Sequence, residues 1–130
     1  MKTTIAIVTV VVIIGAILLL ANKSSSSKST NPTEKIQNVS VIEGKQIIEI
    51  SAKGGYSPKK SVAKAHIPTI LRFNTKGTFD CSSSVRIASM DISRSLPNSG
   101  SLDIELGNPQ TGKLQGTCSM GMYAFDVDFQ

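Results

Sequence analysis

The sequence has few of the side chains that carry most enzyme chemistry. Its 130 residues include one histidine and two cysteines. It lacks a Ser/His/Asp order typical of hydrolases, a glycine-rich phosphate-binding loop and a C-x-x-C pair. We therefore expect a protein that is not an enzyme.

The charge is distributed so that nucleic acid is not expected as a partner. The formal net charge is +5, but residues 1–35 carry four lysines against one glutamate and so hold +3 of it. The remainder of the chain is nearly neutral, and it has no run of basic residues and no basic residues interleaved with aromatic ones. An electrostatic surface for phosphate groups is thus missing from the body of the protein.

The amino-terminal part contains a long uncharged stretch, Thr3 to Ala21. It is just long enough to cross the hydrocarbon core of a membrane as a helix. A cleaved signal peptide is the alternative, but the stretch is longer than the roughly 7 to 15 apolar residues of such peptides, and no clear A-x-A cleavage site follows it. The pattern favours an uncleaved transmembrane signal anchor over residues 1–22.

A serine-rich segment follows the apolar stretch. Residues 23–35 contain no apolar side chain that would bury surface, which is typical of a flexible linker. A domain boundary is therefore expected near Ile36, with one folded domain over residues 36–130.

This domain shows the alternation of β-strands. Apolar side chains recur at every second position in residues 47–52, 69–73, 101–106 and 123–129, and glycine- and proline-rich turns separate them at 54–58, 74–77, 96–100 and 107–112. No window has the period of an amphipathic helix. We expect six to eight short strands in an antiparallel sandwich or barrel, with the carboxylates on outward positions.

Sulfur is concentrated near the carboxyl end. The segment TCSMGMY, residues 117–123, places Cys118 close to Met120 and Met122, with Gly121 between the methionines. Thiolate and thioether groups are the ligands that soft metals such as Cu(I) prefer. The other cysteine, Cys81, opens the strand-like run CSSSVRI, and a Greek-key arrangement can bring strands that are distant in sequence side by side.

Several short motifs in this order resemble one family. They are GGYSP (residues 54–58), a strand that ends in a phenylalanine, F-x-C (79–81), the pair LP (96–97) and the late C-x-MGM-Y (118–123). The chain from about residue 46 to 129 is similar to small cupredoxin-like domains of the EfeO-type or plastocyanin-like branch, found on bacterial membrane anchors or fused to copper-transporting ATPases. The resemblance implies an all-β, Greek-key β-sandwich with a metal site at one end, between the Cys81 region and the turn after Cys118.

The ligand set departs from that of blue copper proteins. A blue copper site needs two histidines, a cysteine and a weak axial ligand, whereas this chain has only His66, which is expected far from the cysteines. The remaining metal ligands are four sulfur side chains: Cys81, Cys118, Met120 and Met122. Gly121 would let the turn bend so that both methionines point at one ion. Met90 is assigned to packing, and Asp80 is expected to be a solvated turn residue.

The sequence leaves two main functions open. The first is an outward-facing, membrane-anchored Cu(I)-binding protein that stores, delivers or detoxifies copper, with a copper transporter or copper chaperone as partner and the body on the extracytoplasmic side. The second is a structural or interaction domain in which Cys81 and Cys118 form a disulfide and Met120 and Met122 fill gaps in the core. An electron carrier is a third alternative, which a site without histidine supports poorly.

Overall fold

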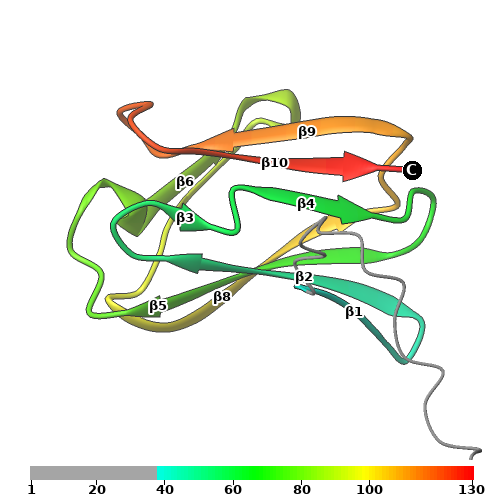
Figure 1. Cartoon of the computed structure of the whole chain (residues 1–130), viewed down its shortest axis with the longest axis horizontal. Helices are drawn as coiled ribbons and strands as arrows, with labels where there is room; N and C mark the ends of the chain where they lie inside the picture. The colour runs from blue at the N-terminus through cyan, green and yellow to red at the C-terminus, as the bar shows by residue number, and fades with distance from the viewer. Residues whose placement is uncertain (1–37) are drawn as a thin grey trace, which may run out of the picture. The chain divides into compact units, whose positions relative to one another are not determined.

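Two β-sheets packed face to face make up the part of the chain that the computed structural model describes, residues 38–130 (Figure 1). The only helical elements among these residues are two short 3-10 turns, so the all-β sandwich is confirmed. The elements are β1 (Val39–Ile42), β2 (Lys45–Ala52), β3 (Tyr56–Ser57), β4 (Lys60–Ala63), β5 (Thr69–Lys76), η1 (Cys81–Ser83), β6 (Ser84–Ile87), η2 (Ala88–Met90), β7 (Ile92–Ser95), β8 (Ser99–Gly107), β9 (Gly112–Thr117) and β10 (Ala124–Phe129).

Strands that are distant in sequence pair in both sheets. The first sheet has the order β1-β2-β5-β8, with β3 beside β2, and the second has the order β4-β10-β9-β6-β7. Most neighbouring strands are antiparallel, but β2 pairs with β5 and β4 pairs with β10 in parallel. The prediction of purely antiparallel sheets is therefore wrong for these two pairs. The chain between the members of each parallel pair runs through other strands, which gives it the length that a parallel pairing needs.

The core lies between the sheets and follows the predicted alternation. On β2, Ile48 and Ile50 are fully buried, and on β10, Phe125, Val127 and Phe129 are at most 2% exposed. Apolar side chains at every second strand position thus face the opposite sheet. The centre of the core also holds three aromatic rings, those of Tyr56, Phe73 and Phe125, in edge-to-face contacts with centroids 5.1–5.9 Å apart.

Two local predictions differ from the structure. Strand β5 continues through Asn74 to Lys76, where the sequence predicts a turn, and residues 81–83 form the 3-10 turn η1 instead of starting a strand. The first difference arises because Thr75 is buried and its hydroxyl donates to the carbonyl of Gly100 on β8. The second arises because Asp80 caps η1 through the backbone N–H of Ser82.

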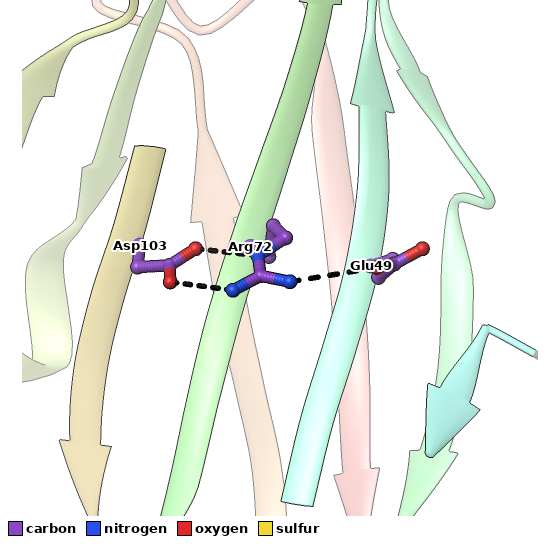
Figure 2. Close-up of polar contacts among 3 residues, drawn as sticks. All are labelled: Glu49, Arg72 and Asp103. Atoms are coloured by element: carbon purple, nitrogen blue, oxygen red, sulfur yellow. Dashed lines mark hydrogen bonds and ion pairs between the residues drawn. The ribbon is translucent and has the colours of Figure 1, made fainter. Parts of the chain in front are cut away.

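The outer face of the first sheet carries a row of charges that crosses three strands (Figure 2). Arg72 on β5 donates two hydrogen bonds to the carboxylate of Asp103 on β8, at 2.7 and 2.8 Å, and lies 3.9 Å from a carboxylate oxygen of Glu49 on β2. The hydrogen bond and charge of Arg72 lower the pKa of Asp103. The outward positions predicted for Glu49 and Asp103 are confirmed, and their pairing with Arg72 favours the observed register.

The predicted anchor, residues 1–22, and linker, residues 23–35, lie outside the described residues, as does the predicted boundary at Ile36. Between residues 38 and 130, no helix has the length and apolar character needed to span a bilayer.

Candidate metal centre

Both cysteines and two of the methionines belong to loops at one end of the sandwich. We call this end, at the left of Figure 1, the cysteine end; it consists of the β2–β3 loop (residues 53–55), the connection from β5 to β6 (77–83) and the β9–β10 loop (118–123). Strand β6 follows one of these connections and β9 precedes another, and the two strands pair at Arg86 and Thr117. This pairing places Cys81 and Cys118 next to each other although 37 positions separate them in sequence.

The two cysteines form a disulfide. Their Cα atoms are 5.9 Å apart, and neither is a free thiol. The convergence of the two sulfurs at one end, which the metal hypothesis requires, is therefore present. In this oxidised state neither sulfur is a thiolate, so neither is a strong ligand for a soft metal.

The β9–β10 loop turns tightly and directs its methionines outward. Gly121 has a φ of +73°, a conformation that glycine adopts without strain, and its N–H donates to the carbonyl of Cys118 at 3.0 Å. The N–H of Cys118 donates to the carbonyl of Tyr123, also at 3.0 Å. Met120 is 76% exposed and Met122 is 61% exposed. The alternative that these methionines fill gaps in the core is therefore wrong, and both thioethers are accessible to an ion.

A third exposed apolar side chain belongs to the β5–β6 connection at the same end. Phe79, two residues before Cys81, is 78% exposed. The sequence gives no sign of this exposure, because F-x-C reads equally well as a buried aromatic before a strand.

Ser84 connects the two loops that carry the cysteines. Its hydroxyl donates to the carbonyl of Cys81 at 3.3 Å and accepts from the N–H of Ser119 at 3.2 Å, and the two serine hydroxyls lie 2.6 Å apart. The loop after β9 is thereby held against the start of β6. Sequence reasoning missed Ser84, since a serine within CSSSVRI carries no signal that points to residue 119.

Asp80 connects the β2–β3 loop to η1. Its carboxylate accepts hydrogen bonds from the hydroxyl and N–H of Ser82 and, at 2.9 Å, from the N–H of Gly54. The hydroxyl of Ser82, followed by the N–H groups of Gly54 and Ser82, lowers the pKa of Asp80. Asp80 is exposed as expected, but it also fixes the β2–β3 loop to η1, which sequence reasoning missed. The position of an aspartate directly before C-S-S is typical of a helix cap, and this pattern could have predicted the role of Asp80.

Tyr56 lies beneath these loops. Its hydroxyl donates to the backbone carbonyl of Ser84, and its side chain is 2% exposed. Burial, with a smaller contribution from the charge of Asp80, raises the pKa of Tyr56 to about 12. The phenol therefore stays protonated and serves as a fixed donor under the cysteine end.

His66 and Met90 lie away from the cysteine end. The N–H of His66 donates to the carbonyl of Pro109, and the preceding residue Ala65 is hydrogen bonded to Gln130, at the opposite end of β10 from Cys118. Met90 lines a surface cavity with Phe129 near that same opposite end. Within residues 38–130, no three histidine, cysteine or acidic side chains cluster as metal ligands would.

The comparisons with known proteins agree with this architecture. The family model of the cupredoxin-like domain matches residues 10–126. The chain therefore belongs to the cupredoxin-like domain family. The narrower EfeO-type branch stays a prediction. No curated protein matches the chain in sequence.

Solved structures with the same fold include copper proteins. One is the metal-binding domain of the Cu(I)-exporting P-type ATPase CopA of Streptococcus pneumoniae D39 with Cu(I), at 20% identity and a TM-score of 0.64, covering 71% of this chain and 92% of that one. Another is a copper-binding protein in the apo form, at 23% identity and a TM-score of 0.66, covering 72% and 96%. A third is auracyanin A, a blue copper protein of Chloroflexus aurantiacus, at 13% identity and a TM-score of 0.53, covering 67% and 100%. At these identities the likeness shows the fold alone.

Proposed function

We propose that the reduced form of this chain binds Cu(I) at the cysteine end. Cys81 and Cys118 are the thiolate ligands, and Met120 or Met122 completes the site. The observation that carries the proposal is that all four sulfur side chains belong to loops at one end of a cupredoxin-like sandwich, two of them as exposed thioethers. Solved structures with the same fold include a domain that holds Cu(I).

The chemistry of these residues suits a cargo ion rather than a catalytic one. Thiolate and thioether ligands favour Cu(I), and exposed thioethers can be exchanged one at a time for ligands of a partner. A pair of histidines that would support a blue copper site is missing from the cysteine end, since His66 lies at the opposite end of β10. We therefore propose a copper-binding module that stores, delivers or detoxifies copper, and not an enzyme or an electron carrier.

The proposed location is the outer face of a cell membrane. The apolar run from Thr3 to Ala21 would be the anchor, residues 23–35 the linker, and the body would lie on the extracytoplasmic side. The disulfide supports this side, because such bonds persist in oxidising compartments. A copper transporter or copper chaperone in the same membrane would be the exchange partner.

A Cu(I) titration tests the copper proposal. The full chain is reduced with a dithiol, freed of reductant without oxygen, and titrated with Cu(I) against a chromophoric Cu(I) chelator. We expect stoichiometric uptake, with an affinity that falls by about tenfold or more in Cys118→Ser and by less in Met122→Leu. Met90→Leu is the matched control, because Met90 lies away from the cysteine end, and it should bind as the wild type does.

The second candidate function is a disulfide-stabilised structural or interaction domain without metal. The observed disulfide favours it directly. Absence of Cu(I) uptake by the reduced wild-type chain would contradict the copper proposal and leave this candidate. An intense blue colour on addition of Cu(II) would instead support the electron carrier.

A further inference from the structure

The two sulfurs of the disulfide differ in how accessible they are. Cys81 is partly exposed, as the first residue of η1. Cys118 is 1% exposed, below the β9–β10 loop. The backbone N–H of Tyr123 points at the Sγ of Cys118 and donates a hydrogen bond to it at 3.4 Å.

The loop over Cys118 is also held in place. The N–H of Gly121 and the carbonyl of Tyr123 are hydrogen bonded to the backbone of Cys118, each at 3.0 Å. Ser119 is bonded to Ser84 through both its N–H and its hydroxyl. Access to Cys118 therefore requires several hydrogen bonds to break, whereas Cys81 is already partly exposed.

We propose that a small thiol or dithiol opens this disulfide by attacking the Sγ of Cys81, so that Cys81 takes the mixed disulfide and Cys118 leaves as a thiolate. The proposal assigns a direction to the step that generates the copper-binding form, and in that sense it deepens the proposed function. The direction itself depends only on the disulfide and its surroundings.

The exchange balances with a dithiol as the two-electron reductant. Its thiolate donates an electron pair to the Sγ of Cys81, and the Sγ–Sγ bond breaks with its pair going to Cys118. The second thiolate of the dithiol then attacks its own sulfur in the mixed disulfide and releases Cys81 as a thiolate. The dithiol ends as a disulfide, and its two protons pass to the cysteines or to solvent.

Two physical factors favour attack on Cys81 with Cys118 as the leaving thiolate. Attack needs access to the sulfur that is attacked, and Cys81 is the more exposed of the two residues. Exchange is also faster when the leaving sulfur is a stabilised thiolate, and the N–H of Tyr123 stabilises negative charge on Cys118. Burial of Cys118 opposes that charge, and the hydrogen bond from Tyr123 offsets part of this cost.

The direction is measured by trapping the first adduct. The full-length disulfide form, without copper, is mixed briefly with excess glutathione, quenched with acid, alkylated and digested for mass spectrometry. We expect the adduct with glutathione on Cys81 to exceed the adduct on Cys118 by about tenfold or more, because access decides the site of attack. A ratio near one, or an excess on Cys118, would overturn the proposal.

Two controls separate local structure from intrinsic reactivity. The same reaction in concentrated urea should give nearly equal adducts, since the loops are then open. Ser84→Ala, which releases Ser119, should raise the share of adduct on Cys118 in the folded protein. A strong preference for Cys81 that persists in urea would assign the effect to neighbouring sequence and overturn the structural explanation.

The outcome is independent of copper. Equal adducts in the folded protein would contradict this inference and leave the Cu(I) proposal standing. Failure of the reduced chain to bind Cu(I), together with a strong preference for Cys81, would contradict the copper function alone.

Discussion

At the scale of single residues, the cysteine end depends on polar side chains that join distant loops. Tyr56 bonds to a carbonyl 28 residues away, Asp80 to an N–H 26 residues away, and Ser84 to an N–H 35 residues away. These contacts fix the loops that carry the four sulfur side chains. Each bond satisfies a donor or acceptor that would otherwise need water.

Because of Tyr56, the free energy of unfolding should depend on pH in the alkaline range. The pKa of Tyr56 in the folded protein is about 12, above the ordinary value of 10.0 for a tyrosine, so its contribution to stability is fully present below pH 10. As pH rises from 10 to 12, the unfolded chain loses the phenolic proton while the folded chain keeps it. The free energy of unfolding should therefore fall, by at most about 1.4 kcal/mol per pH unit from this group.

The variant Tyr56→Phe tests this pH dependence by comparison with the wild type. The variant should be less stable near neutral pH, by about 1 kcal/mol, because the carbonyl of Ser84 loses its donor. Its urea-unfolding free energy should fall less steeply than that of the wild type between pH 10 and 12. The two proteins differ only at residue 56, so parallel slopes would show that the pKa of Tyr56 is not raised.

The roles of individual residues at the cysteine end were the feature least predictable from the sequence. The four sulfurs were readable because their side-chain chemistry is distinctive wherever they lie. Ser84 and Tyr56 were not, because a hydroxyl group is functional here only through partners that the tertiary fold brings to it. The disulfide stood as one of two alternatives, since spacing alone does not reveal whether two cysteines meet.

At the scale of elements, strands were predicted well and their pairing less so. Alternation identified β2, β5, β8 and β10, because each has one face in the core. The parallel pairs β2–β5 and β4–β10 could not be predicted, because partner choice depends on packing between distant segments. The turn η1 was missed because a polar cap, Asp80, overrides a strand-like pattern.

Strand β9 contains a glycine whose replacement would bring a side chain into contact with the core. A Cβ atom at Gly116 would lie 2.1 Å from the ring of Phe125, which faces it on β10. The ring is 1% exposed and packs against Tyr56 and Phe73, so moving it would disturb the core. The ring of Phe125 therefore lies against the backbone of β9 at Gly116, and a side chain at this position would overpack the core.

Gly116→Ala should lower the free energy of unfolding by about 1–3 kcal/mol, as overpacking does in a dense core. Urea unfolding of the oxidised protein provides the measurement. Lys113→Ala, at an exposed position of the same strand, is the control and should change stability little. A Gly116→Ala protein as stable as the wild type would mean that Phe125 does not lie against β9.

At the scale of the whole molecule, the disulfide closes a long loop between the two cysteines, which are 37 positions apart. In the chain-entropy description, closing a loop of this length stabilises the folded state by roughly 4 kcal/mol. Reduction, which the copper proposal requires, should therefore leave a domain that is folded but less stable.

Reduction by a dithiol should lower the urea-unfolding free energy by about 4 kcal/mol. The double variant Cys81→Ser/Cys118→Ser should resemble the reduced wild type and should not respond to the dithiol. An unchanged unfolding midpoint after complete reduction would contradict the stabilising role of the disulfide. If Cu(I) binds only the folded dithiol form, adding it should raise the stability of the reduced wild type but not that of the double variant.

The central claim is that this member of the cupredoxin-like family holds copper with sulfur alone. X-ray absorption at the copper edge, on the reduced full chain loaded with Cu(I), reads the ligand atoms directly. Our account predicts a first coordination shell of sulfur only, with fewer sulfurs in Cys118→Ser. A shell of nitrogen or oxygen atoms, or a spectrum unchanged by that substitution, would contradict it.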